Sequence, residues 1–289
     1  MSFVIEDVED EDMTNIEERV DEKHRVKSSN QKQLEKKKQK KKETPIPMLS
    51  KAELGQIVDL IHDGQEEEAK QLIPAGVRHL PLVYYNKPLL HIAVEHGFCV
   101  IVNYLLDGGA DIDLKDSTND TPLFVAVENK QFKCCELLLD RGAKIDVKDR
   151  HGSTPLMVAT GGGLDDICEL LLDHGANIKV RDSFKQTLLM HAVLDENEST
   201  CKLLLRKGAN VNVVDKRGNT ALHHAVLTEN PSIVNCLLLA GARTRIKNED
   251  GHTPLMLAIA NELQEIIILL TNDRGDRIIV AESACKHQR

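Results

Sequence analysis

A regular spacing of 33 residues constrains the fold of this chain more than any other feature of its sequence. A Gly-Ala pair recurs at this step without insertion or deletion, beginning at residues 109, 142, 175, 208 and 241. A leucine followed three residues later by an alanine recurs in the same phase; the leucines are Leu90, Leu123, Leu156, Leu189, Leu222 and Leu255. A period of this length is typical of a solenoid, in which one supersecondary unit is stacked along an axis. We therefore expect repeats rather than a single globular core.

Each copy contains signals that begin and end two short helices. A Thr-Pro dipeptide places a side-chain acceptor at a helix N-cap and a proline at the first helical position. These dipeptides stand at 121–122, 154–155 and 253–254. Thr187 and Thr220 keep the cap without the proline. A second helix is expected over residues 134–141 in one copy, ending at Gly142 because glycine accepts the left-handed conformation of a C-cap. Aspartates before turn residues are expected to begin an exposed hairpin, at Asp116, Asp149, Asp182 and Asp215.

These copies resemble the ankyrin repeat. The family's signature, Thr-Pro-Leu-His-x-Ala, appears as TPLFVA at 121–126, TPLMVA at 154–159 and TPLMLA at 253–258. It appears more loosely as PLLHIA at 88–93, TLLMHA at 187–192 and TALHHA at 220–225. The resemblance covers residues 52–272 and implies an all-α fold, an ankyrin-repeat solenoid of helix pairs with short β-hairpin loops. The signature histidine stands at His91 and His223, and other residues replace it in the remaining four copies.

Composition and phase divide the chain into four parts. Residues 1–44 lack a sustained apolar period and are expected to form a disordered tail, acidic and then basic. Residues 45–84 are expected to form a degenerate N-terminal capping repeat, because terminal repeats need a polar outer face. We expect six ankyrin repeats over residues 85–272 and a C-terminal cap or tail over residues 273–289.

The last copy is more apolar than a closing repeat should be, since nothing stacks beyond it. Ile268 replaces a residue that is polar in the five preceding copies, namely Asn103, Glu136, Glu169, Lys202 and Asn235. The repeat phase fails after Asn272, where Arg274 stands in place of the periodic glycine. We expect the apolar cluster 278–280 to cover the last repeat as a cap. In the alternative, the uncovered patch binds a partner or a second copy of the chain.

The formal net charge of −9 conceals three blocks of alternating sign. Residues 1–22 carry ten acidic residues and one basic residue, residues 23–50 carry ten basic and two acidic residues, and the remainder is acidic. The basic block contains a dense lysine run, made of Lys36, Lys37, Lys38, Lys40, Lys41 and Lys42. This run predicts a nuclear import signal or a phosphate-binding tail. Alternatively, it is a solvated charge run or the internal partner of the acidic block. Nucleic-acid binding is disfavoured, because no aromatic or structured reader accompanies the lysines.

No pattern in the sequence predicts catalysis, a metal site or a cofactor site. Metalloprotease, nucleophile-elbow and kinase patterns are lacking, as is a glycine loop that ends in lysine. Cys135, Cys168 and Cys201 share one repeat position and are expected to be reduced core residues, since no CxxC pair exists. No apolar run reaches the ~20 residues of a membrane span, and the N-terminus lacks an apolar signal segment. We expect a non-enzymatic cytoplasmic or nuclear protein that binds neither membranes nor small molecules.

The resemblance implies that protein partners bind to the hairpin tips and to the concave face of the first helices. Interfaces are enriched in aromatic and arginine side chains. The tip residues that we expect to bind are Tyr84, Tyr85, Arg150, His151, Phe184, Lys216 and Arg217. Lys185 stands where a turn glycine is usual, which predicts backbone strain.

The order of charged tail, lysine run and repeats is similar to ankyrin-type transcriptional cofactors and to inhibitors of Rel-type transcription factors. We therefore expect a protein that scaffolds or regulates an intracellular partner, with transcription regulation in the nucleus as the finer expectation. One alternative is a substrate adaptor of a ubiquitin ligase. Another is a nucleic-acid-associated protein that binds through the lysine run and therefore loses affinity steeply with salt.

Overall fold

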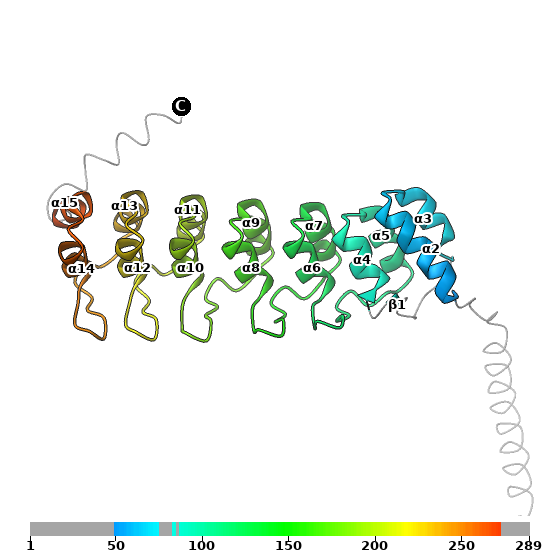
Figure 1. Ribbon diagram of the computed structural model, residues 1–289, viewed down its shortest axis with the longest axis horizontal. Helices are drawn as coiled ribbons and strands as arrows, with labels where there is room; N and C mark the ends of the chain where they lie inside the picture. The colour runs from blue at the N-terminus through cyan, green and yellow to red at the C-terminus, as the bar shows by residue number, and fades with distance from the viewer. Residues whose placement is uncertain (1–48, 75–82, 85–86, 273–289) are drawn as a thin grey trace, which may run out of the picture. The chain divides into compact units, whose positions relative to one another are not determined.

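The computed structural model describes residues 49–74, 83–84 and 87–272 (Figure 1). The predictions made for residues 1–44, for Tyr85 and for residues 273–289 lie outside the described residues. The described helices are all short, and they alternate along the chain in pairs. This arrangement confirms the expected all-α solenoid of helix pairs.

Fourteen helices make up the described part of the chain. In chain order they are α2 (Lys51–His62), α3 (Glu66–Leu72), α4 (Leu89–Glu95), α5 (Cys99–Asp107), α6 (Pro122–Glu128), α7 (Phe132–Asp140), α8 (Pro155–Gly161), α9 (Asp165–Asp173), α10 (Leu188–Leu194), α11 (Glu198–Arg206), α12 (Ala221–Leu227), α13 (Pro231–Leu239), α14 (Pro254–Ala260) and α15 (Gln264–Asn272). The first helix of each pair packs against the first helix of the next pair, and the second helices pack in the same way. The result is two layers of helices, with the hairpin loops projecting from one side (Figure 1).

One short β-hairpin precedes the six in-phase helix pairs. Strand β1 (Val83–Tyr84) pairs antiparallel with β2 (Lys87–Pro88), so that Val83 lies opposite Pro88 and Tyr84 opposite Lys87. An isolated bridge between Arg181 and Thr187 closes a later hairpin in the same way. Between the later helix pairs the loops are held mainly by turns.

The threonine caps form as the sequence predicts. In α6, α8, α10, α12 and α14 the side chain of the preceding threonine accepts a hydrogen bond from the backbone N–H three residues later. The second helix of one copy begins at Phe132, two residues before the predicted start, and ends at Asp140. Its N-cap, Gln131, makes no side-chain cap. Because no capping residue marks this end, the sequence lacked the signal that would locate it.

The periodic residues fill the centre of the stack. Leu123, Leu156, Leu189 and Leu222 are at most 1% exposed, and every alanine of the pattern is fully buried. Cys135, Cys168 and Cys201 are buried and free, as expected. The periodic glycines end the second helices at positive φ, for example 85° at Gly142. Small and branched side chains therefore supply the core, and the scarcity of aromatic residues does not weaken it.

The two signature histidines lie in the core and differ in their hydrogen bonds. His223 donates from Nε2 to the backbone oxygen of His252 at 3.1 Å. Its Nδ1 accepts from the backbone N–H of Thr220 at 3.1 Å and lies 2.8 Å from the hydroxyl of the same residue. His91 likewise donates to the backbone oxygen of Asp120 at 3.0 Å. Within the described residues, however, Nδ1 of His91 has no partner.

Candidate protein-binding surface

The hairpin tips are built on aspartates that bond to their own loop. Oδ1 of Asp182 accepts from the backbone N–H groups of Phe184 at 2.9 Å and Gln186 at 2.7 Å. The equivalent aspartates 116, 149 and 215 make the same pair of bonds. Such Asx turns fix the loop backbone without using core residues. The backbone of each tip is therefore held by its own aspartate.

Neighbouring tips are also joined by backbone hydrogen bonds. The N–H of Lys216 donates to the oxygen of Phe184 at 2.9 Å, and the N–H of Glu249 donates to the oxygen of Arg217 at 2.9 Å. These bonds connect the loops before α10, α12 and α14. The three loops thus present one continuous surface along the stack.

Phe184 is the most exposed large hydrophobic side chain described, at 64%. The ammonium group of Lys216, from the next loop, lies 6.0 Å from the centroid of its ring, which is within the range of a cation–π contact. Lys185 has a φ of 60°, so the strain that its sequence position predicts is present. Its backbone oxygen accepts from Nε of Arg181 at 2.8 Å. The structure therefore brings together two of the predicted binding residues, Phe184 and Lys216.

The remaining predicted tip residues lie in different settings. Arg150 and His151 are both exposed and adjacent, with Arg150 Nε donating to Nε2 of His151 at 3.0 Å. Arg217 is exposed on its loop. Tyr84 is not a free tip, because it is half-buried and a Cβ added to Gly55 of α2 would lie 3.4 Å from its hydroxyl oxygen. Its ring packs against the N-terminal helix pair, a tertiary contact that the local sequence does not reveal.

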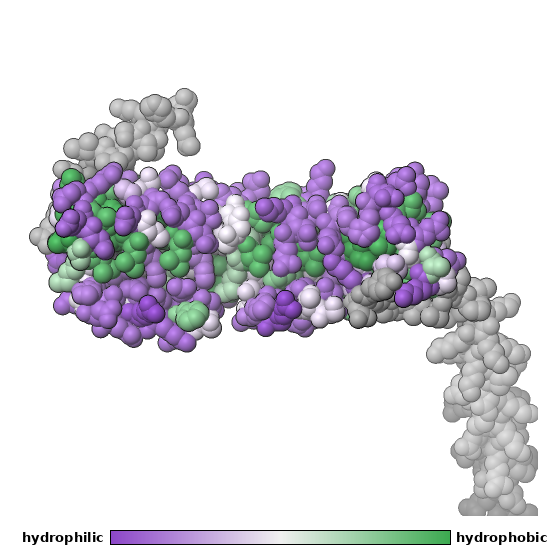
Figure 2. Space-filling view, viewed as in Figure 1, coloured by the Kyte–Doolittle hydropathy of each residue, from purple (hydrophilic) through white to green (hydrophobic). Residues whose placement is uncertain are grey.

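A second exposed feature lies at the last position of each first helix, and sequence reasoning missed it. This position, called here the helix-end row, is occupied by Glu95, Glu128, Gly161, Leu194, Leu227 and Ala260. Leu194 is 39% exposed and Leu227 is 50% exposed, although leucine usually lies in the core. The row could have been found from the sequence by comparing this position at the 33-residue step. Figure 2 shows that hydrophobic residues gather at the level of the helices, and that the hairpin side is mainly hydrophilic.

The N-terminal half of the helix-end row is acidic. Glu95 pairs with the ammonium group of Lys87 at 2.5 Å. The pKa of Glu128 is raised, first by partial burial and then by the nearby carboxylates of Asp120, Asp149 and Asp116. Within the described residues Glu128 has no ion-pair partner. A cationic group bound here would relieve the repulsion among these carboxylates.

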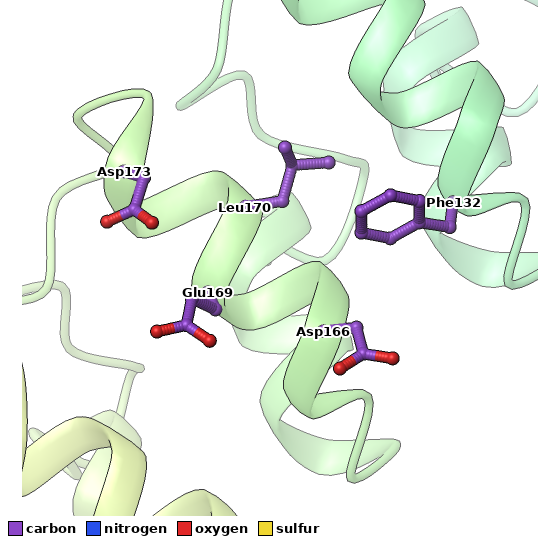
Figure 3. Close-up of a pocket in the computed structure, with 5 residues that line it drawn as sticks. All are labelled: Phe132, Asp166, Glu169, Leu170 and Asp173. Carbon is purple, nitrogen blue, oxygen red and sulfur yellow. The ribbon is translucent and has the colours of Figure 1, made fainter.

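A hollow of about 380 Å³ lies between α7 and α9 on the second-helix layer. Figure 3 shows Phe132 of α7 facing Leu170 of α9, with carboxylates around them. Two of these carboxylates already have a partner, because the ammonium group of Lys207 lies 3.3 Å from Glu169 and 2.5 Å from Asp173. These ion pairs join α9 to the C-cap of α11, in the next helix pair. Within the described residues no group of three or more His, Cys, Asp or Glu side chains could hold a metal ion.

The buried thiols are held in their protonated form. Burial raises the pKa of Cys135 to about 12, of Cys168 to about 11 and of Cys201 to about 12. A thiol at such a pKa is a poor nucleophile near neutral pH. These cysteines therefore act as packing residues.

None of the helices in the described part of the chain combines the length and apolar character needed to traverse a lipid bilayer.

A family model described as ankyrin repeats, in three copies, matches residues 59–149, 90–182 and 189–281. The chain is similar to a crystal structure of an ankyrin repeat domain from Acinetobacter baumannii AYE, with 31% identity and a TM-score of 0.61, covering 64% of this chain and 97% of that one.

It is also similar to the ankyrin repeat domain of Bcl-3, described as a unique member of the IkappaB protein family. Here the identity is 28% and the TM-score 0.67, covering 74% of this chain and 97% of that one. No protein in the curated set resembles the chain closely enough to count as a match.

Proposed function

Because the chain belongs to the ankyrin-repeat family, whose arrays generally act as protein–protein interaction modules, we propose that it binds a protein partner through its hairpin tips and helix-end row. The observation that carries this proposal is the pair Leu194 and Leu227. The same position holds glutamate, glycine or alanine in the other copies, so the stack does not require leucine there. Exposed leucines on two helices that pack together form an apolar patch suited to a partner.

The two halves of the helix-end row favour a partner segment with two kinds of side chain. Apolar residues would bury against Leu194 and Leu227, and basic residues would face Glu128 and its neighbouring carboxylates. Packed helices lie about 8–10 Å apart, so α6 and α10, two steps apart, are separated by about 16–20 Å. A bound helix rises 1.5 Å per residue and would span this distance with about 11–13 residues. We therefore propose an amphipathic partner segment with a basic end.

The leucine pair can be tested against a matched control in the same chain. Leu239 is 58% exposed but lies on α13, in the other helix layer. The full chain, the double variant Leu194→Ser/Leu227→Ser and the control Leu239→Ser would each be used to capture proteins from a cell extract, with quantitative mass spectrometry. A partner at this surface is retained by the control and lost by the double variant. Once isolated, its affinity for the double variant should fall by about 2 kcal/mol or more, roughly 30-fold.

The result that would contradict the proposal is equally definite. If every protein retained by Leu239→Ser is also retained by the double variant, the helix-end row is not the binding surface. Unfolding curves of the three proteins provide the folding control, because surface substitutions should change stability by no more than about 0.5 kcal/mol. A parallel comparison with Phe184→Ala tests the tips.

We further propose that the chain scaffolds or regulates an intracellular partner and takes part in transcription regulation in the nucleus. Two observations support this: the similarity to the Bcl-3 ankyrin domain and the lysine run that precedes the repeats. Replacing Lys36, Lys37, Lys38, Lys40, Lys41 and Lys42 with alanine should reduce the nuclear fraction of a tagged chain. An unchanged distribution would contradict the import role. Recovery of ubiquitin-ligase subunits, or of nucleic acid in a salt-sensitive manner, would instead favour the two alternatives.

A further inference from the structure

The last helix pair has an exposed apolar face, whereas the equivalent face of each earlier pair is buried. Ile259 of α14 is 56% exposed. The residues at the same position in the five preceding copies, Val94, Val127, Thr160, Val193 and Val226, are all fully buried. Met256 is likewise 49% exposed, whereas its equivalents Phe124, Met190 and His223 are at most 2% exposed and Met157 is half-buried. In the earlier copies the next helix pair packs over these side chains. The same apolar positions on α14 therefore form a surface that a further segment could cover.

The residues after α15 repeat a segment that follows an earlier second helix. Residues 274–280 read Arg-Gly-Asp-Arg-Ile-Ile-Val, and residues 141–147 read Arg-Gly-Ala-Lys-Ile-Asp-Val. The glycines of the two segments, Gly142 and Gly275, correspond if one residue is inserted after α15. The family match also continues past the last described helix, to residue 281. The repeat phase therefore does not fail at Arg274 but shifts by one residue.

In the earlier copies this segment is the stem that leads into the next hairpin. Its two apolar positions are half-buried, as at Ile145 and Val147, and the residue between them, Asp146, is exposed. The same alternation holds at Ile178, Lys179 and Val180, where both apolar residues pack against the core. In this alignment Ile278 and Val280 correspond to the half-buried Ile145 and Val147, and Ile279 corresponds to the exposed Asp146.

We propose that the C-terminal segment of this chain covers the exposed face of α14 and α15, beginning with residues 274–280 as the stem of a seventh copy. Ile278 and Val280 lie against the last helix pair as Ile145 and Val147 lie against theirs. The occupant is this segment rather than a second chain, because it starts directly at the end of α15 and carries the stem pattern of the array.

The register makes a test possible within three consecutive residues. Hydrogen–deuterium exchange of the full chain would be followed by mass spectrometry for peptides from α14 and α15. Ile278→Asn and Val280→Asn, singly and together, should deprotect these helices, with exchange of α15 rising about tenfold or more in the double variant. Ile279→Asn is the matched control and should leave exchange unchanged. Peptides from α6 to α8 should keep their protection in all variants, which shows that the array remains folded.

Two other results would overturn the proposal. If Ile279→Asn deprotects α15 as strongly as the other two substitutions, or if none of the three has an effect, the segment does not lie in this register. Sedimentation velocity tests the second-copy alternative. A dimer that dissociates in Ile259→Ser but persists in Ile268→Ser, whose exposure is 55% at a position that is polar in other copies, would show that another chain covers the face. A monomer in all cases is the expected result.

Discussion

At the start of α4, a buried histidine nitrogen lacks a hydrogen-bond donor, and the cost of this lack to the free energy of unfolding can be measured. Pro88 is the N-cap of α4 and makes no side-chain cap, and in the described part of the chain Nδ1 of the buried His91 has no hydrogen-bond partner. In α12 the same position is Thr220, whose N–H and hydroxyl both lie within hydrogen-bond distance of Nδ1 of His223. We predict that Pro88→Thr stabilises the protein.

The expected gain follows from three terms. A threonine N-cap is worth about 1 kcal/mol. Satisfying a buried acceptor removes a penalty of about 1–3 kcal/mol, part of which overlaps with the cap. Losing the proline costs about 0.4–1 kcal/mol, because the unfolded chain gains freedom. The backbone does not oppose the change, since φ is −63° at Pro88 and −89° at Thr220, both allowed for threonine. The net gain should be about 1–2 kcal/mol.

Equilibrium urea unfolding of the full chain measures this gain, and hydrogen exchange of α4 shows whether it is local. The reciprocal change, Thr220→Pro, removes both donors from His223 and should destabilise α12 by a similar amount or more. In a His91→Leu background, Pro88→Thr should keep only the cap contribution. The reasoning is refuted if Pro88→Thr leaves stability unchanged or lowers it. It is also refuted if the gain is as large without the histidine.

Other predictions follow from the same structure. Burial lowers the folded-state pKa of His91 and His223 below the ordinary 6.5, so the unfolded chain binds protons first as the pH falls. The free energy of unfolding should therefore be highest above pH ~6.5 and should decrease as the pH drops toward the folded-state pKa. Urea unfolding midpoints at several pH values measure this decrease. Replacing His223 with glutamine should reduce this slope, and an unchanged slope would contradict the assignment. Lys185→Gly should remove about 1 kcal/mol of strain, offset in part by chain entropy, whereas a lower melting temperature would show that Lys185 makes stabilising contacts. The buried thiols of Cys135, Cys168 and Cys201 should not react with a thiol reagent until the protein unfolds. Prompt labelling of the folded protein would disprove their burial.

Features that recur from copy to copy were predictable from the sequence. The threonine caps and the glycine C-caps are local signals found in five copies each, and the periodic leucine is found in six, so the copies reinforce one another. The backbone strain at Lys185 was predictable for the same reason, because the other loops show which residue the turn prefers. The start of α7 at Phe132 was not, since no capping side chain marks it.

Features that depend on contacts between copies were harder to foresee. Tyr84 was expected at a tip, yet its ring packs against α2 at Gly55, far away in the sequence. The hydrogen bond between the backbones of Lys216 and Phe184 is equally invisible in local sequence. The residues of the helix-end row can be listed from the 33-residue spacing, but the sequence does not show which repeat position is exposed. That question is answered by the packing of the two helix layers rather than by any single helix.

The contacts between neighbouring helix pairs also have a consequence for synthesis. His91 closes its hydrogen bond with Asp120, 29 residues later, and His223 closes its own with His252 at the same separation. These two copies are therefore complete only once the following loop has left the ribosome. At about 5–20 residues per second, one 33-residue copy is added every 2–7 s or so, which is long compared with helix formation. The nascent chain can thus assemble in order from its N-terminal end, exposing the uncovered face of only one copy at a time.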